Sequence, residues 1–193
     1  MSMSLQQQIE SYIRDIDASF GIHIKNIKTK EEIHIDSDRL FQMASVVKIP
    51  ILVTLYEKVY QGEIDLNERI EIKETDLVPG SGVIKDMAPG IMPTIKDLAM
   101  MMIIVSDNLA TDKLIQIVGM EAVQNKMREL GLQHIYIEHT IWDLLRLSVD
   151  VTSESYNQEA YNDVIHRLKM GEYNWDSIVF QENIKNNVST PKD

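Results

Sequence analysis

The sequence predicts an α+β fold, in which a helical lobe makes up most of the molecule and an incomplete antiparallel sheet forms a second, smaller lobe. Apolar residues recur at helical spacing in several segments from residue 44 onward. Two short segments before residue 37 alternate apolar and polar residues, as strands do. The 193 residues are enough for one domain or two small lobes with a substantial core.

The N-terminal region, 1–41, is expected to begin an α/β lobe with one helix and two strands. Apolar residues recur at helical spacing over 5–16. The segments FGIHIKNI and EEIHID then alternate, and the polar KTKE between them indicates a turn that joins antiparallel strands. His23 and His34 alternate with isoleucines on these strands, so we expect both side chains to face solvent.

The segment FQMASVVKIPILVTLYEKVY, Phe41 to Tyr60, is expected to form a buried helix. Pro50 falls near its first turn, where a proline costs a helix least. The helix should therefore begin near Ala44 or Ser45 and end at Gly62, because glycine commonly follows the last helical turn.

Further helices are expected to complete a helical lobe over 42–181. The stretch GEIDLNERIEI indicates a connection with a short strand, and a Gly/Pro-rich loop follows it. Thr94 can then cap a helix, with Asp97 as its third residue. The expected helices are Ile95–Val105, Leu109–Val118, Glu121–Leu130 and Gln158–Lys169, the last one capped by Gly171. Residues 182–193 are expected to form a turn that leads back to the first lobe.

Composition excludes several classes of function. The net charge of −11 argues against a nucleic-acid partner, and the absence of cysteine excludes disulfides, thiolate metal sites and cysteine nucleophiles. No apolar stretch reaches the roughly 18 residues of a membrane span. The N-terminus shows no signal peptide, which favours a cytoplasmic protein, or a secreted one whose signal has been removed.

Ser45 and Lys48 form the first candidate catalytic pair. Three residues apart on a helix, their side chains share one face. A serine hydroxyl needs a base to become a nucleophile, and burial in an apolar helix can lower the pKa of a lysine enough to make it that base. The alternative is a helix cap followed by a lysine that extends to solvent. The spacing also occurs at Ser189 and Lys192, in a predicted turn.

Ser106, Asp107 and Asn108 form the second candidate element, a polar triplet between two apolar helices. Such a triplet can present a hydroxyl and an amide to a cleft while the aspartate holds the turn. The alternative is a simple helix break with a capping residue. A second Ser-x-Asn, at 155–157, lies in a polar loop without a comparable setting.

In this order the two elements resemble the serine β-lactamase and penicillin-binding superfamily, specifically its class A β-lactamase-like branch. The stretch PGSGVIKDMAPGIMPTIKDLAMMMIIVSDNLATDKLIQIVG is similar to the family's loop and helices around Ser-Asp-Asn. NNVSTPKD resembles the family's Thr-Pro turn near the omega loop. The resemblance covers about 19–132 and 186–193, and it implies the β-lactamase/transpeptidase-like fold.

The resemblance also implies roles for individual residues. Ser45 would be the acylated nucleophile, Lys48 its base or the support of one, and Ser106 a proton relay to the leaving nitrogen. Asn108 and Ser81 would contact the substrate, a β-lactam or a peptide-like small molecule, and no cofactor or metal would be needed. The alternatives are an esterase or peptidase of the same superfamily, or a non-catalytic acyl-binding or interaction module.

The third family motif, Lys-Thr-Gly, is absent. The closest strings are Lys28-Thr29-Lys30, which comes too early, and Lys169-Met170-Gly171, which indicates a helix end. The family places this motif after the Thr-Pro turn, so the sequence resembles a member without its C-terminal part. The two strands would then have an exposed edge, which favours pairing with a second copy of the chain as a homodimer.

The region before the Thr-Pro turn also departs from the family. Class A enzymes use Glu-x-x-x-Asn here to hold the deacylating water, and the matching spacing is Glu182 to Asn186, unusually close to Pro191. Glu182 is therefore a candidate deacylation base. Residues 141–180 are an unusual insertion whose aromatic side chains form either a lid, an interface or, as we expect for most of them, satellite core. The five histidines show no metal-ligand spacing.

Overall fold

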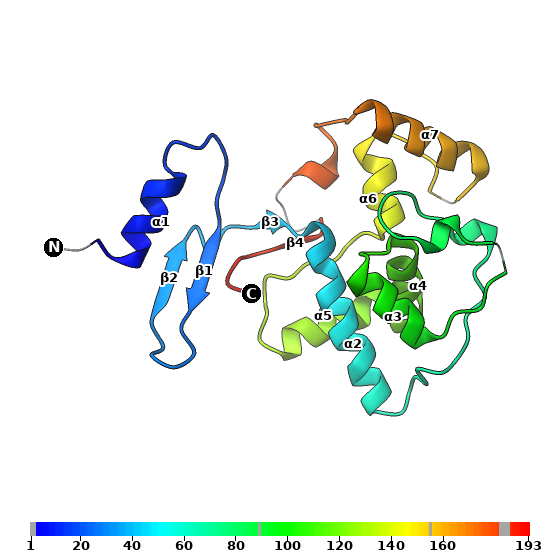
Figure 1. The fold of residues 1–193 in the computed structure, drawn as a ribbon, viewed down its shortest axis with the longest axis horizontal. Helices are drawn as coiled ribbons and strands as arrows, with labels where there is room; N and C mark the ends of the chain where they lie inside the picture. Colours follow the sequence, from blue (N-terminus) through cyan, green and yellow to red (C-terminus); the bar gives the residue numbers. More distant parts are fainter. Residues whose placement is uncertain (1–2, 89, 155, 182–185) are drawn as a thin grey trace.

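The computed structural model describes residues 3–88, 90–154, 156–181 and 186–193. Helices α2 to α7 gather in one body, and α1 lies with β1 and β2 in a small separate layer at the N-terminal end (Figure 1). The helices and strands are α1 (Leu5–Ile13), β1 (Ile22–Lys25), β2 (Glu32–Ile35), β3 (Phe41–Gln42), α2 (Lys48–Tyr60), α3 (Ile95–Ile104), α4 (Asn108–Val118), α5 (Met120–Glu129), α6 (Ile141–Ser148), α7 (Gln158–Met170) and β4 (Val188–Ser189).

The predicted N-terminal hairpin is confirmed. β1 and β2 pair antiparallel, with Ile22 opposite Ile35 and Lys25 opposite Glu32. α1 ends at Ile13, earlier than the sequence indicated, and Ser4 caps its first turn through a reciprocal bond with Gln7. The connection over 62–72 contains no named strand among the described residues, and its only ladder contact there is a single bridge between Arg69 and Thr94.

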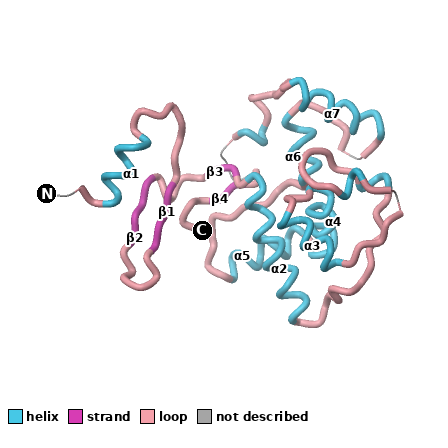
Figure 2. Tube along the Cα trace, in the orientation of Figure 1, coloured by secondary structure: helices cyan, strands magenta, loops and turns pink. Residues whose placement is uncertain are grey.

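A second two-stranded ladder fixes the entrance to α2. β3 pairs antiparallel with β4, so that Phe41 lies opposite Ser189 (Figure 2). The sequence did not indicate β3, because two residues carry no alternation. The predicted C-terminal turn therefore returns the chain to the residues immediately before Ser45, although 144 positions separate Ser45 from Ser189.

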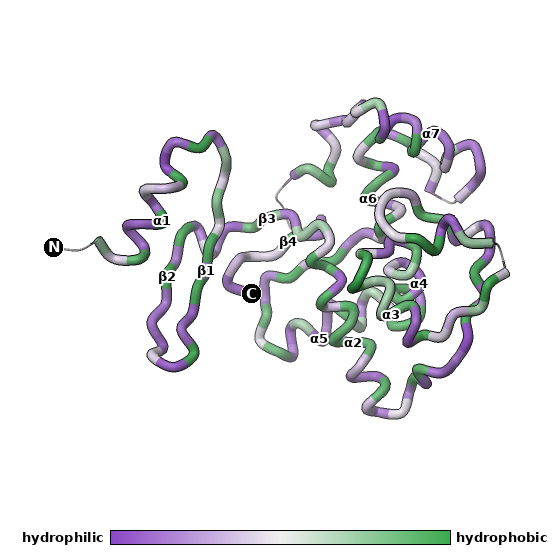
Figure 3. The backbone as a smooth tube through the Cα atoms, in the orientation of Figure 1, coloured by the Kyte–Doolittle hydropathy of each residue, from purple (hydrophilic) through white to green (hydrophobic). Residues whose placement is uncertain are grey.

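The core lies among α2, α3 and α4. Ile51 and Leu55 on α2, Leu98 on α3 and Leu114 on α4 are almost completely buried. Figure 3 shows α3 as largely hydrophobic. The predicted capping box is confirmed, since the Thr94 side chain accepts from the third residue of α3 and that residue's carboxylate accepts from the Thr94 N–H. This packing makes α2 a rigid base for the residues at its start.

Residues 141–180 do not form satellite core, as we had expected for most of their aromatic residues. Trp142 on α6 and Tyr161 on α7 are buried in the main core cluster, and Tyr156 packs against it. The sequence analysis missed α6, whose first two N–H groups donate to the buried Asp112. Because that partner lies on α4, the anchor of α6 is a tertiary contact.

The other three aromatic residues of this region form a separate cluster. Tyr173 and Phe180 meet edge to face with centroids 6.1 Å apart, and Trp175 lies beside both, with its ring tilted by 42° to Tyr173 and by 38° to Phe180. The Trp175 side chain is mostly exposed. Tyr173 and Phe180 also line the cleft described below. Tyr173 and Phe180 therefore lie at the cleft, and all three residues lie outside the main core cluster.

Candidate active site

Ser45 lies in a 3-10 turn, Ala44–Val47, that leads directly into α2. The helix thus begins where the sequence predicted, but with a tighter first turn. Ala44 has a φ of 44°, a left-handed conformation that is costly for any residue except glycine. The N–H of Ser45 falls in the first turn, whose N–H groups lack acceptors within the helix. Strain of this kind is typical of functional sites.

Lys48 is buried, with 2% of its surface exposed, and its ammonium group meets a ring of oxygen acceptors. Nζ lies 2.8 Å from the Ser106 hydroxyl and 2.7 Å from the Ser106 carbonyl oxygen. Asn108 Oδ1 is 3.1 Å away, and Ser45 Oγ is 3.5 Å away. Lys48 therefore contacts both Ser106 and Asn108 of the second candidate element.

Ser106 brings the second element to the nucleophile. Its φ of 54° turns the chain sharply between α3 and α4 and directs the hydroxyl at Ser45, where the two Oγ atoms are 3.0 Å apart. Each contact on the route from Ser45 to the Lys48 amine through the Ser106 hydroxyl is therefore shorter than the direct 3.5 Å contact, which favours proton transfer through Ser106.

Asp107 holds this turn in place, as the sequence indicated. Its buried carboxylate accepts N–H bonds from Val83 and Ile84 in the neighbouring loop and from Ala110 in the first turn of α4. Three donors on one carboxylate leave it little freedom. The loop that carries Ser81 is thereby fixed against the start of α4.

Asn108 and Ser81 complete the polar cluster. Asn108 donates through Nδ2 to the Pro79 carbonyl at 2.9 Å, which orients its amide, and its Oδ1 faces Lys48. The Ser81 hydroxyl lies 2.8 Å from the Ser106 carbonyl oxygen and 3.1 Å from Asn108 Oδ1. Ser45, Lys48, Ser106, Asn108 and Ser81 therefore form one connected group.

Burial sets the electrostatics of the site. Desolvation lowers the pKa of Lys48, against the attraction of Asp107 and Asp112, which act to raise it. Burial also raises the pKa of Asp112 to about 7, although two backbone N–H donors from α6 and the charge of Lys48 act in the opposite direction. A lysine with a lowered pKa is better suited to accept a proton near neutral pH.

A cleft of about 300 Å³ opens beside Ser45. Ser45, Ser81 and Asn108 form part of its polar wall, and Leu144 and Leu145 of α6 form part of its apolar wall. Its further lining includes Tyr173, Phe180, Asn186 and Asn187. The sequence analysis did not single out Asn187, whose side chain accepts from the N–H groups of Glu138 and His139.

The remaining sequence candidates do not belong to this cluster or are not described. Glu182 lies outside the described residues, so the structure neither supports nor opposes its assignment as deacylation base. The second Ser-x-x-K has its serine in β4 and its lysine 3.4 Å from Asp38, so it forms no equivalent pair. The serine of the second Ser-x-Asn, at 155, also lies outside the described residues.

Comparison with known proteins places this chain in a family. Residues 4–193 match the family model described as the beta-lactamase enzyme family. Beta-lactamase VEB-1 from Pseudomonas aeruginosa is 30% identical over 118 residues, which are 60% of this chain and 40% of that protein. Beta-lactamase regulatory protein BlaB from Streptomyces cacaoi is 26% identical over 144 residues, 74% of this chain and 46% of that protein. This chain thus spans less than half the length of these relatives.

Solved structures show the same fold. A beta-lactamase from Sphaerobacter thermophilus superposes with a TM-score of 0.71 at 28% identity, over 89% of this chain and 64% of that one. A single-substitution mutant of PBP-A, in an acyl-enzyme complex with penicillin-G, gives a TM-score of 0.68 at 25% identity, over 84% of this chain and 68% of that one. Among the described residues, no helix is both long and apolar enough to cross a membrane. The chain belongs to the beta-lactamase enzyme family, with an α+β fold whose sheet is incomplete.

Proposed function

We propose that this chain carries the acylating machinery of a β-lactamase-like serine hydrolase, with a β-lactam or a related peptide-like amide as substrate. The observation that carries the proposal is the contact of Ser106 Oγ with both Ser45 Oγ, at 3.0 Å, and the buried Lys48 amine, at 2.8 Å. A nucleophile, a relay and a base are thus joined by hydrogen-bond distances in one cleft.

The first half of the reaction forms the acyl-enzyme. The neutral amine of Lys48 accepts the Ser106 proton while Ser106 accepts the proton of Ser45. The Ser45 oxygen then bonds to the substrate carbonyl carbon. The carbonyl oxygen gains the electron pair of the C=O π bond, and the Ser45 N–H stabilises that charge. When this electron pair re-forms the C=O π bond, the bond between the carbonyl carbon and the leaving nitrogen breaks.

The same residues then supply the proton that the leaving nitrogen needs. Lys48, now an ammonium, returns a proton through the Ser106 hydroxyl to the leaving nitrogen. The Lys48 amine is then neutral again, and Ser45 carries an ester. Asn108 is positioned to hydrogen-bond the amide side chain of a substrate in the cleft, because Pro79 orients its amide group. Ser81, on the opposite loop, limits where the substrate carbonyl can lie.

The relatives support this proposal by what their names state. The structure of the single-substitution mutant of PBP-A is described as an acyl-enzyme complex with penicillin-G, and VEB-1 is named a beta-lactamase. This chain spans only part of the length of these relatives.

The proposal is tested by covalent labelling. The purified chain is incubated with penicillin G. Its intact mass is then measured to count adducts, and peptide mapping locates them. We expect one adduct, on Ser45, and none in Ser45→Ala. Ser189→Ala is the matched control, because it removes the serine of the second Ser-x-x-K without touching the cleft; it should label as fast as the unchanged chain.

Three outcomes would contradict the proposal in different ways. An adduct on any residue other than Ser45 would refute the nucleophile. Labelling by a fluorophosphonate but not by penicillin would keep the nucleophile and favour an esterase or peptidase. No labelling by either reagent would favour a non-catalytic binding module.

Independently of the catalytic proposal, we propose that the chain pairs with a second copy through an exposed sheet edge. Within the described residues β1 pairs only with β2, so the other edge of β1 carries backbone groups that can accept a partner strand. Sedimentation equilibrium over a range of concentrations tests this pairing, and a strictly monomeric mass would refute it.

A further inference from the structure

A second group of side chains lies on one face of the N-terminal hairpin, remote in sequence from the active-site residues. His23 lies opposite His34 in the register of β1 and β2, and Lys25 lies opposite Glu32. Residues two apart on a strand share a face, so these four side chains project on the same side of the sheet. Their face is the one opposite the isoleucines. None of them lines the cleft at Ser45.

The potential ligand atoms of three of these residues converge. Glu32 Oε2 lies 3.2 Å from His34 Nε2 and 3.5 Å from His23 Nε2. The two imidazole rings stack with centroids 4.7 Å apart and planes 17° from parallel. All three ligand atoms lie within 4.8 Å of one another. This spacing allows a single ion to contact all three after small side-chain rotations.

Neighbouring groups orient the three ligands. Lys25 Nζ lies 2.5 Å from Glu32 Oε1, which leaves Oε2 for the histidines. Ser37 Oγ lies 3.1 Å from His34 Nδ1. When Nδ1 donates that bond, Nε2 presents a lone pair towards Glu32. Partners of this kind orient the ligands of metal sites and fix the histidine tautomer.

The cluster also contains an unsatisfied atom. His23 Nε2 is buried and has no hydrogen-bond partner among the described residues. An unpaired buried polar atom is costly, and here it faces a carboxylate oxygen and a second imidazole nitrogen. In the tautomers in which both Nε2 atoms carry a lone pair, no hydrogen-bond donor lies between these three atoms, and a cation placed among them would satisfy all of them at once.

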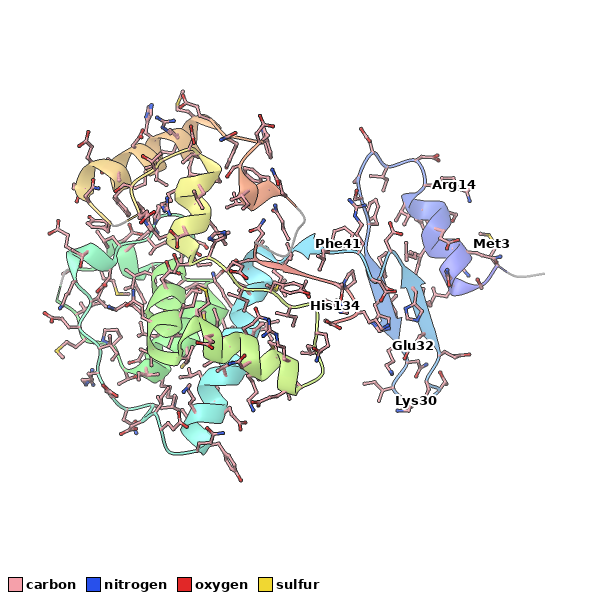
Figure 4. All side chains as sticks on the ribbon, turned by 180° about the vertical axis from the view of Figure 1, so that it is seen from behind. Met3, Arg14, Lys30, Glu32, Phe41 and His134 are labelled. Atoms are coloured by element: carbon pink, nitrogen blue, oxygen red, sulfur yellow. The ribbon has the colours of Figure 1, made fainter. Side chains whose placement is uncertain are left out.

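We propose that His23, His34 and Glu32 bind one divalent transition cation of the Zn²⁺ type. Two imidazole nitrogens and one carboxylate oxygen are a donor set that such ions take, and water fills the remaining position. The ion joins β1 to β2 and stabilises the hairpin. Figure 4 labels Glu32 on the hairpin, well apart from the helical body. The site is therefore structural and separate from the chemistry at Ser45. The sequence spacing did not reveal it, because the ligands come from two strands.

The experiment measures Zn²⁺ binding by calorimetry on the untagged, chelator-treated chain near neutral pH, and Co²⁺ binding by visible absorption. We expect one ion per chain, and a melting temperature that rises with Zn²⁺ because the ion binds the folded state. Replacing an orienting partner of a metal ligand commonly weakens binding about 10–100-fold, so Ser37→Ala should show that loss and His34→Gln at least as much.

His134→Gln is the matched control. His134 is an exposed histidine with a single carboxylate partner, Asp193, at 3.0 Å, so its loss should leave Zn²⁺ affinity unchanged. Glu32→Gln keeps the side-chain shape and provides a second variant if His34→Gln unfolds. Penicillin labelling of Ser45 should be equal in all these variants, which separates this site from the proposed function.

Two results would overturn the proposal. If the unchanged chain binds neither Zn²⁺ nor Co²⁺, the three side chains do not form a metal site. If His34→Gln and Glu32→Gln bind the ion as tightly as the unchanged chain, the metal lies elsewhere.

Discussion

At the scale of single residues, the site depends on one buried amine. Lys48 has oxygen acceptors at 2.7, 2.8 and 3.1 Å and almost no contact with water. Those acceptors orient the amine, and burial lowers its pKa because desolvation makes the charged form less favourable than it is in water. The same residue therefore has to be both well held and able to lose its proton.

Lys48→Arg should greatly slow acylation while keeping a cation in the site. Arginine stays protonated at any practical pH, so it cannot accept the Ser45 proton. We expect the penicillin labelling rate to fall about 10²–10⁴-fold, the usual contribution of a general base. In the unchanged chain, the rate should rise with pH and level off below the ordinary lysine value of 10.5, because burial lowers the pKa. Mass spectrometry of samples quenched at successive times, over a series of pH values, measures the labelling rate of the variant and the pH dependence of the rate in the unchanged chain. A variant that labels at the original rate would exclude Lys48 as the base.

Asp112 should make stability depend on pH. Burial raises its pKa from 3.8 to about 7, so between these values the folded chain binds a proton that the unfolded chain has released. The free energy of unfolding from this group therefore falls as pH rises from about 4 to 7, by at most about 1.4 kcal/mol per pH unit.

Urea unfolding of the unchanged chain and of Asp112→Asn over this pH range tests the expectation. Subtracting the two curves removes the contributions of other groups, including Glu32 and Asp97, whose lowered pKa values act at lower pH with the opposite sign. A difference that stays flat or rises from pH 5 to 7 would contradict it.

At the scale of elements, the site is assembled by a loop locked against a helix start. Asp107, at the N-cap of α4, binds the N–H groups of Val83 and Ile84 and so fixes the loop that carries Ser81. Gly82, which follows Ser81, has a φ of +107°, and a Cβ there would lie 2.6 Å from the Asp107 Cα. Only glycine allows this close approach without moving one of the two segments.

Gly82→Ala should consequently destabilise the chain by more than backbone strain alone. A left-handed alanine costs about 1–2 kcal/mol, and the clash with Asp107 adds a similar amount, as overpacking does. Gly62→Ala is the matched control, because Gly62 has a φ of +77° and nothing within 4 Å of a Cβ. Urea unfolding should show the larger loss for Gly82→Ala, and only this variant should slow Ser45 labelling. Equal losses in the two variants would show that the loop accommodates the methyl group.

At the scale of the whole molecule, the proposed function has candidate groups for acylation within these 193 residues but only part of those for turnover. The Lys-Thr-Gly motif is absent from these 193 residues, and the candidate base Glu182 is not described. In the family that the sequence resembles, the strand that carries this motif supplies the second oxyanion donor. The loss of one such donor commonly costs about 2.7–4 kcal/mol of transition-state stabilisation.

The purified 193-residue chain should therefore hydrolyse nitrocefin far more slowly than about 10 s⁻¹, the median turnover of enzymes. Any acyl-enzyme should accumulate, because the candidate deacylation base, Glu182, lies unusually close in sequence to Pro191 and is not expected to be well placed. Absorbance kinetics with Ser45→Ala as the blank measure this rate. Turnover near the median would show that groups interpreted here as structural, or a second chain, supply what is missing.

The sequence by itself determined the features that depend on residues a few positions apart. The Ser45–Lys48 spacing, the Thr94 capping box and the helix break at Ser106 are local, because helix geometry and capping involve neighbours within one or two turns. The hairpin was predictable for the same reason, since alternation and a short turn fix its pairing. The family resemblance added the expectation that the two catalytic elements meet.

Only the tertiary structure decided the distances and burial that make these residues a site. Ser45 and Ser106 are 61 positions apart, and their 3.0 Å contact depends on the packing of α2 against α3 and α4. α6 is anchored by Asp112 of α4, and the His23–Glu32–His34 cluster forms across two strands. Burial lowers the pKa of Lys48 and raises that of Asp112 only after several elements have packed around them. Desolvation depends on all the atoms that surround a group, so no local pattern of residues specifies it.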